Sequence, residues 1–176
     1  MLLTNTKSSM NKKLFLFTVC IIILIAAFFI EWRIKRKVLF SIDLTGLVLN
    51  DLNDNEVILS NFKNKPLVLN FWGTWCGPCL EELAAFENVR KNYVGRVTFI
   101  MVSDESIDKI KKFQQKNNYS FLFVRSLKSF DDLGIASVPV TSLYDENGNL
   151  FTTKNSSLDE EELNNMIEAM MKSKPK

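Results

Sequence analysis

The sequence predicts an α/β fold in which helices cover both faces of a mixed β-sheet, preceded by one transmembrane helix. Apolar strand-like runs alternate with helical patterns through the middle of the chain, which is typical of parallel βαβ units. Pairs of short strands separated by turn residues flank this region, which indicates antiparallel hairpins. A mixed sheet follows because both kinds of connection occur in one domain.

The apolar run Leu14–Ile30 carries no charged residue and would rise about 26 Å as a helix, while Trp32 could extend it to a membrane interface. A cleaved signal peptide and a buried core helix are the alternatives. A signal peptide usually has a shorter apolar region that ends in small residues, whereas Ala26 and Ala27 are followed by bulky side chains. We therefore expect an uncleaved signal anchor. The chain then divides into an N-terminal tail (1–12), a transmembrane signal anchor (13–32), a basic linker (33–40) and a folded domain (41–172).

The first half of the folded domain contains a predicted hairpin, a central strand and a helix. The apolar runs Leu47–Leu49 and Val57–Leu59 flank residues 50–55, which are dense in Asn and Asp, so a hairpin is expected. Leu67–Phe71 is apolar on both faces, as expected at the centre of a sheet. A helix should run from Pro78 to about Asn92, because proline suits the first helical turn.

The second half begins with a buried-type strand at Arg96–Val102 and an amphipathic helix at Ser106–Lys116, followed by a short strand at Phe121–Val124. A second hairpin, with Asn-Gly in its turn, and a terminal helix complete the domain. The hairpin strands are Val140–Tyr144 and Leu150–Thr153, and the helix Leu158–Lys172 should be capped by Ser157 or Ser156 with Glu160 nearby.

Two cysteines separated by two residues stand where the central strand gives way to the first helix. Cys76 and Cys79 can close a disulfide with each other, and a helix N-terminus favours the thiolate of the first cysteine. A zinc site needs about four ligands, but the chain has no histidine and only one other cysteine, Cys20, inside the apolar run. We therefore expect redox chemistry at this dithiol and no metal.

Composition narrows the function further. The 176 residues are 47% hydrophobic and 24% charged, as in an ordinary globular domain, and a formal charge of +2 gives no support for nucleic-acid binding. The absence of histidine removes Ser-His and Cys-His catalytic pairs. Cys76 must therefore be activated by the helix dipole, backbone donors or other charges.

The segment Phe71–Cys79 (FWGTWCGPC) resembles the active-site segment of thioredoxin-like proteins, and the longer pattern is similar to the membrane-anchored TlpA/ResA branch of that family. An N-terminal hairpin at 47–59, a strand-helix insertion at about 106–124 and a Pro-x-Thr segment within Val138–Gly148 match features of that branch. The resemblance covers residues 41–172 and implies a thioredoxin-like fold.

The resemblance also implies roles for individual residues. Cys76 would attack a substrate disulfide, and Cys79 would resolve the mixed disulfide. Pro139 would form a cis-proline loop facing the dithiol, whereas the ordinary interpretation is a turn or edge proline. Trp75, Val138 and Pro139 would contact the substrate, with the backbone around Val138 pairing with an extended segment.

Two positions depart from thioredoxin itself. Asn70 stands six residues before Cys76, where thioredoxin has a buried acid, and Glu82 stands three residues after Cys79, where the TlpA/ResA branch often has a Glu. Residues i and i+3 share a helix face, so Glu82 should lie beside Cys79 whereas Glu81 points elsewhere. Glu82 is either a solvated helix charge or a partly buried base, with a raised pKa, that serves Cys79.

The activity implied by the resemblance is reduction of protein disulfides by a membrane-tethered thiol-disulfide oxidoreductase that needs no cofactor. In this branch, such reductants prepare apocytochrome c for haem attachment and are recharged by a membrane thiol-transfer protein of the DsbD/CcdA type. The alternatives are a dithiol oxidase or isomerase of secreted proteins, and a binding or assembly factor with a secondary dithiol. A peroxidase is disfavoured because no Pro-x-x-x-Thr-x-x-Cys pattern occurs.

The side of the membrane on which the domain lies does not follow from charge. Lysines precede the apolar run, and lysines and arginines follow it, so the positive-inside rule does not decide the orientation. A tethered dithiol is most useful where disulfides form. We therefore expect the catalytic domain on the extracytoplasmic side of the cell membrane.

Overall fold

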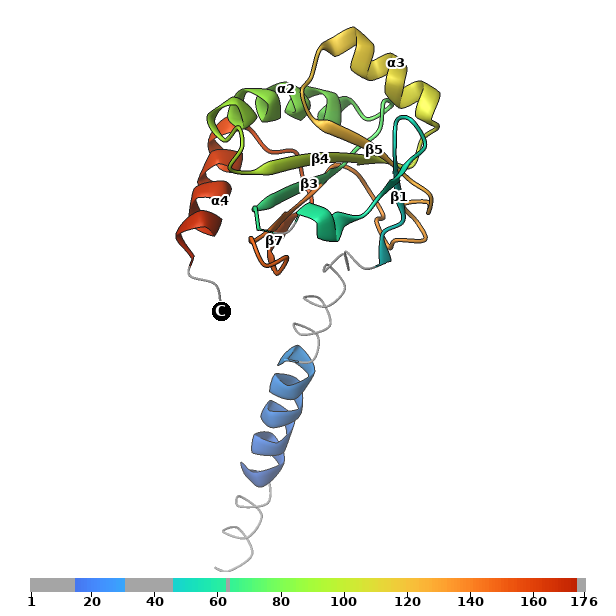
Figure 1. The fold of residues 1–176 in the computed structure, drawn as a ribbon. Coiled ribbons are helices and arrows are strands. Elements are labelled where there is room, and N and C mark those ends of the chain that lie inside the picture. Colours follow the sequence, from blue (N-terminus) through green and yellow to red (C-terminus); the bar gives the residue numbers. More distant parts are fainter. Residues whose placement is uncertain (1–14, 31–45, 63, 174–176) are drawn as a thin grey trace, which may run out of the picture. The chain divides into compact units, whose positions relative to one another are not determined.

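The computed structural model describes residues 15–30, 46–62 and 64–173 (Figure 1). The chain divides into two compact units, Met1–Phe40 and Ser41–Lys176. In the first unit, residues 15–30 form a helix whose side chains are almost all exposed. No helix among the described residues is long and apolar enough to cross a membrane. The ends of the expected anchor, the tail at 1–12 and the linker at 33–40 lie outside the described residues.

The second unit is built on one seven-stranded sheet in the order β2-β1-β5-β4-β3-β6-β7 (Figure 1). The strands β3, β4 and β5 are parallel, and the others pair antiparallel, so the predicted mixed sheet is confirmed. The strand bounds are Leu49–Asp51 (β1), Glu56–Val57 (β2), Leu67–Phe71 (β3), Thr98–Ser103 (β4), Leu122–Ser126 (β5), Val140–Tyr144 (β6) and Leu150–Lys154 (β7).

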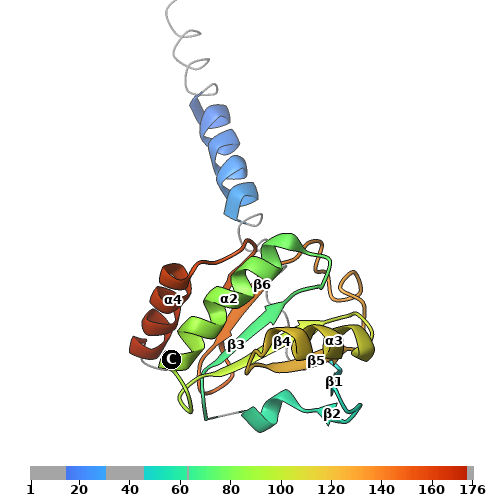
Figure 2. The same ribbon diagram turned by 90° about the horizontal axis from the view of Figure 1, so that it is seen from above.

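The three α-helices of this unit lie on one face of the sheet (Figures 1 and 2). They are Gly77–Asn92 (α2), Ile107–Asn117 (α3) and Glu160–Lys172 (α4). Their buried side chains form one cluster with residues of the sheet such as Val68 and Met101. On the opposite face, Leu59 of the 3-10 helix η2 (Leu59–Phe62) packs with Phe130 and Ile135 of the segment 127–139.

The expectation of α-helices on both faces is therefore wrong for the described residues. The chain steps from β3 to β4 to β5 in one direction across the sheet. Right-handed crossovers between parallel strands then place both connecting helices, α2 and α3, on the same face. The segment 127–139, which leads from β5 to β6, carries the core of the other face instead.

The first hairpin is confirmed, but its strands are shifted along the sequence. The strand β1 extends to Asp51, whose carboxylate accepts hydrogen bonds from the backbone N–H groups of Asn53 and Asn55 at 2.7 and 2.9 Å. This side chain closes the turn that the Asn- and Asp-rich composition predicted. The second hairpin turns at Asn147-Gly148 as expected, with Gly148 at a positive φ of 82°.

The terminal helix begins two residues later than the periodicity predicts. Its N-cap is Asp159, which accepts a hydrogen bond from the Glu162 N–H at 2.8 Å, so the expected serine caps are wrong. The reason lies in Leu158, which is buried and donates its backbone N–H to the Glu82 carboxylate at 3.1 Å. Because the Leu158 N–H is bonded to Glu82 of α2, Leu158 precedes α4, which begins at Glu160.

The central strand β3 sets the position of the functional residues. Its five residues are all buried, which confirms the predicted central strand. Side chains alternate across a strand, so Val68, Asn70 and Trp72 point to the helical face while Leu69 and Phe71 point to the other. The one polar residue of β3 thus lies beneath α2.

Candidate active site

The dithiol caps the helix α2 immediately after the central strand. Cys76 is the N-cap residue, and its Sγ accepts a hydrogen bond from the Cys79 N–H at 3.2 Å. The two sulfurs form a disulfide with an S–S distance of 2.04 Å, so the predicted pairing is confirmed. Cys76 is 5% exposed and Cys79 is fully buried. Backbone N–H groups and the helix dipole therefore act on the sulfur that is nearer to solvent.

Hydrogen bonds to a residue just after β4 fix the loop that precedes the dithiol. The Glu105 carboxylate, two residues beyond β4, accepts hydrogen bonds from the Thr74 backbone N–H at 2.6 Å and from its hydroxyl at 2.9 Å. The Glu105 side chain is only 7% exposed. The motifs of the sequence did not indicate Glu105. The feature that could have indicated it is an acidic residue just past a strand parallel and adjacent to β3, because the carboxyl ends of parallel strands meet at one edge of a sheet.

The segment before β6 lies directly against the dithiol. The Val138 carbonyl oxygen is 3.7 Å from the Cys76 Sγ, and the Val138–Pro139 peptide bond is cis, as the resemblance implied. Thr141, two residues further on, is in register with Asn70 of β3. The antiparallel pairing of β6 with β3 therefore brings the proline loop to the end of α2 that carries the cysteines.

Trp75 is the large apolar side chain exposed beside the dithiol. Its residue is 67% exposed, although its neighbours Cys76 and Trp72 are buried. A Cβ placed on Gly73 would lie 2.7 Å from the indole Nε1 of Trp75. In this conformation of Trp75, a side chain at position 73 would therefore collide with the indole.

Glu82 is a buried group and not a solvated helix charge. It is 3% exposed, whereas Glu81 is exposed. Its Oε1 accepts a hydrogen bond from the Asn70 Nδ2 at 2.7 Å, and its Oε2 accepts one from the Leu158 N–H at 3.1 Å. Burial raises the pKa of Glu82 from 4.5 to about 7, against the opposing effect of these two donors. The carboxyl can therefore both hold and release a proton near neutral pH.

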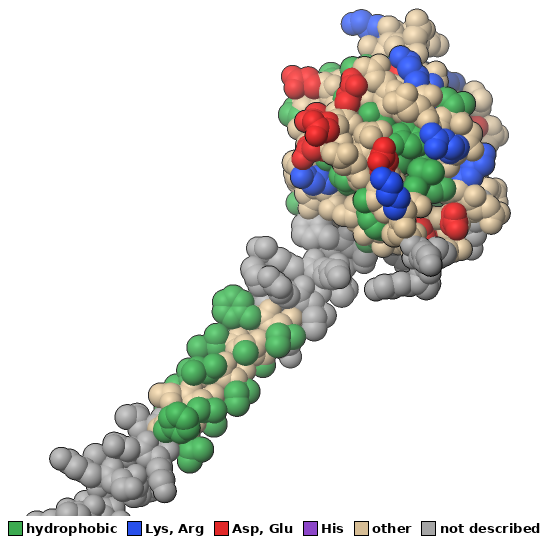
Figure 3. All heavy atoms as spheres, turned by 90° about the vertical axis from the view of Figure 1, so that its left-hand side faces the viewer, with side chains coloured by type: hydrophobic (Ala, Val, Ile, Leu, Met, Phe, Trp, Pro, Cys, Tyr) green, Lys and Arg blue, Asp and Glu red, His purple; other side chains and the backbone are tan. Residues whose placement is uncertain are grey.

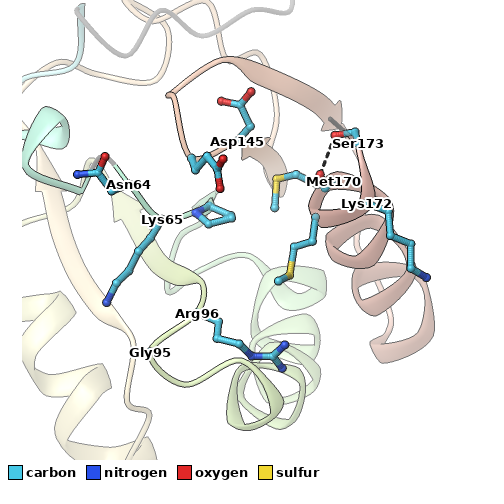
Figure 4. Close-up of a pocket in the computed structure, with 11 residues that line it drawn as sticks. Asn64, Lys65, Gly95, Arg96, Asp145, Met170, Lys172 and Ser173 are labelled. Atoms are coloured by element: carbon cyan, nitrogen blue, oxygen red, sulfur yellow. Dashed lines mark hydrogen bonds between the residues drawn. The ribbon is translucent and has the colours of Figure 1, made fainter. Parts of the chain in front are cut away.

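A hollow of about 490 Å³ lies away from this site (Figure 4). It is lined by Pro66, which precedes β3, and by Met170 near the end of α4, whereas the dithiol follows the far end of β3. On the face seen in Figure 3, lysine and arginine side chains are interspersed with acidic ones, without a continuous basic stripe. The hollow therefore does not include the dithiol, whose Cys76 sulfur is only slightly exposed beside the exposed Trp75.

Comparisons with known proteins agree with this geometry. A family model described as the AhpC/TSA family matches residues 42–161. The thiol-disulfide oxidoreductase ResA of Geobacillus thermodenitrificans is 27% identical over 172 residues, which cover 91% of this chain and 97% of that protein. The thioredoxin-like protein YneN of Bacillus subtilis is 31% identical over 105 residues, which cover 57% of this chain and 62% of YneN.

Solved structures show the same fold. StoA from Bacillus subtilis has a TM-score of 0.57 at 22% identity, covering 68% of this chain and 94% of StoA. A secreted disulfide oxidoreductase of Mycobacterium tuberculosis, homologous to DsbE of E. coli, has a TM-score of 0.61 at 21% identity, covering 72% and 96% of the two chains. The thioredoxin-like arrangement predicted from the motifs is thereby confirmed.

Proposed function

This chain belongs to the AhpC/TSA family and is a thioredoxin-like thiol-disulfide oxidoreductase, and on that premise we propose that it is tethered to a membrane and reduces disulfides of extracytoplasmic proteins. The observation that carries the proposal is the Cys76–Cys79 disulfide at the N-terminus of α2, with the Val138 carbonyl 3.7 Å from the Cys76 sulfur. Apocytochrome c is the candidate substrate implied by the resemblance to the TlpA/ResA branch.

The reaction begins with the reduced dithiol. The Cys76 thiolate attacks one sulfur of the substrate disulfide, which forms a mixed disulfide and releases the first substrate thiolate. Cys79 then gives its proton to the Glu82 carboxylate and attacks the Cys76 sulfur, which releases the second substrate thiolate. One substrate thiolate takes up the proton held by Glu82, and the other takes one from solvent, which received the Cys76 proton when its thiolate formed. Two electrons and two protons thus pass to the substrate, and the Cys76–Cys79 disulfide remains.

The substrate is held as an extended segment. The backbone at Val138, ahead of Pro139, lies beside the reactive sulfur and offers its groups for strand-like pairing. Trp75 supplies an exposed apolar surface on the same loop as Cys76. Main-chain pairing of this kind accepts many sequences, as a general reductant requires.

The oxidised protein must then be recharged. A membrane thiol-transfer protein of the DsbD/CcdA type is the proposed donor, and it would attack the same Cys76 sulfur. This step returns the dithiol to the state that reduces substrates.

Reductive function predicts a low reduction potential. No histidine lies between the cysteines, where it would stabilise the thiolate and make the disulfide a stronger oxidant. We expect a midpoint nearer to the value of about −270 mV found for thioredoxin than to about −120 mV found for DsbA. Equilibration of the full-length protein against dithiothreitol, followed by tryptophan fluorescence, measures it. A midpoint near that of DsbA would favour the oxidase or isomerase.

Tethering predicts a specific topology. A phosphatase that needs disulfides, fused after Lys176, should be active, because the run Leu14–Ile30 would anchor the domain and its dithiol would act on the side where disulfides form. The control is the same fusion without residues 14–30, which should lose both activity and membrane sedimentation. Activity of a cytoplasm-only reporter at that position would overturn the placement.

A further inference from the structure

Asn70 is a polar side chain at the centre of an otherwise apolar strand. It is fully buried in β3, where the other four residues are Leu67, Val68, Leu69 and Phe71. A buried amide is unfavourable unless its groups find hydrogen-bond partners. The hydrogen-bond partners of Asn70 must therefore compensate for its burial in the sheet.

In the Asn70 amide, the N–H donors have hydrogen-bond partners in the described part of the chain, whereas the carbonyl oxygen has none. The Nδ2 donates to Glu82 Oε1 at 2.7 Å and to Thr141 Oγ1 at 3.0 Å, whereas the buried Oδ1 has no hydrogen-bond partner in the described part of the chain. An amide has two N–H donors and two acceptor lone pairs. The arrangement satisfies every donor at the expense of the acceptor, so it orients positive N–H dipoles toward the carboxylate.

We propose that Asn70 is a positioning residue: its amide, fixed by Thr141, holds the Glu82 carboxylate in the orientation from which it exchanges a proton with Cys79. The inference rests on the proposed role of Glu82 in resolving the mixed disulfide. It adds two residues to the machinery of that step, and neither carries a charge.

The geometry fixes the carboxylate at both oxygens. Asn70 from β3 holds Oε1, and the Leu158 backbone N–H from the segment before α4 holds Oε2 at 3.1 Å. Two donors on different oxygens define the plane of a carboxyl group, whereas one would leave it free to turn. Cys79, three residues earlier on α2, is on the same helix face. The groups that act on the Glu82 pKa are burial and these two neutral donors, with no ionised side chain among them.

Thr141 connects this network to the proline loop. It is the cross-strand partner of Asn70 and lies two residues after Pro139. Its hydroxyl accepts from the Asn70 Nδ2 and keeps that donor in place, which prevents the amide from turning its oxygen toward the carboxylate. The strand whose N-terminal loop contacts the Cys76 sulfur thus also orients the group that serves Cys79.

The test measures resolution of a mixed disulfide in the full-length protein with Cys20→Ser, so that only the dithiol reacts. Reaction with Ellman's reagent places thionitrobenzoate on Cys76, and attack by Cys79 releases it as a coloured thiolate. The rate is recorded from pH 5 to 9 in single turnovers, a range chosen to bracket a base that titrates at about 7. Asn70→Ala, which removes the amide without adding a charge, and Thr141→Val are the test variants, and cooperative thermal melting shows that each is folded.

Loss of the donor destabilises the charged carboxylate, so the pH midpoint of the rate should rise. We expect a rise of about one pH unit, or about tenfold slower resolution below the midpoint, in Asn70→Ala, and a smaller rise in Thr141→Val. The matched control is Asn88→Ala, which removes an exposed amide that donates to Glu160 at 2.6 Å, and it should keep the wild-type midpoint. If Asn70→Ala does not fold, Thr141→Val decides.

Glu82→Gln tests the role of Glu82 separately from the roles of Asn70 and Thr141. Slow resolution in Glu82→Gln together with unchanged midpoints in both test variants would overturn the role of Asn70 and Thr141 while leaving that of Glu82. Wild-type rates in Glu82→Gln would overturn the role of Glu82 and the inference built on it.

Discussion

Replacing Cys76 with serine will abolish disulfide exchange, and replacing Cys79 with serine will leave the protein covalently bound to its substrates. Cys76 caps the helix and is the less buried sulfur, whereas Cys79 is fully enclosed. Loss of the attacking thiolate should lower the exchange rate on the order of a thousandfold or more. Reduction of a model protein disulfide measures the first effect. Non-reducing gels of the Cys79→Ser protein, incubated with extracytoplasmic proteins, show the second as higher-mass adducts.

Cys20→Ser is the matched control, because Cys20 lies in the helix 15–30 and forms no disulfide. It should exchange disulfides at the wild-type rate. In the reduced protein, Cys76 should be alkylated before Cys79, and the reverse order would contradict the assigned roles. Normal function in the Cys76→Ser protein would instead favour the binding or assembly factor.

Replacing Glu82 with glutamine will slow resolution of the mixed disulfide by about ten- to a hundredfold above neutral pH. Glutamine keeps the shape of the side chain but cannot take a proton from Cys79. The wild-type rate should rise with pH through about 7, where the buried Glu82 ionises, and the variant should lack this rise. The control is Glu81→Gln, which alters an exposed carboxyl one residue away and should change nothing.

The same substitution should remove the loss of stability that Glu82 causes as pH rises. Glu82 binds its proton more tightly in the folded protein, with a pKa of about 7 against 4.5 when exposed. Its contribution is therefore fully present below about pH 4.5 and is lost as pH rises through 7, a change of about 3 kcal/mol. Denaturant unfolding of the oxidised proteins should show Glu82→Gln as similar to wild type at low pH and more stable above pH 7. Equal stabilities throughout would mean that Glu82 does not titrate near neutrality.

Local sequence patterns were sufficient to predict the elements that depend on interactions between residues close together in the sequence. The apolar run of β3, the proline near the start of α2 and the spacing of Cys79 and Glu82 predicted the central strand, the helix start and the shared helix face. Each of these depends on residues within one or two helical turns of one another. The AhpC/TSA match over residues 42–161 supports the same arrangement.

What the sequence did not predict depends on residues far apart along the chain. The tether from Glu105 to Thr74 joins positions 31 residues apart, the Asn70–Thr141 contact joins positions 71 apart, and the Leu158–Glu82 bond joins positions 76 apart. Only the strand order and register bring these groups together. The prediction of α-helices on both faces of the sheet was wrong for the same reason, because the direction in which successive strands are added is a property of the whole sheet.

Gly73 has a consequence for the entropy of substrate binding. The Trp75 indole lies against the backbone at a position where any Cβ would collide with it, yet 67% of the residue remains open to solvent. A side chain that is ordered only on binding loses about 0.5–1.5 kcal/mol of rotational freedom at that moment. Because Trp75 is largely exposed in the free protein, a peptide that covers the indole beside Cys76 would incur this ordering cost, and glycine at position 73 leaves the ring room to settle against the backbone.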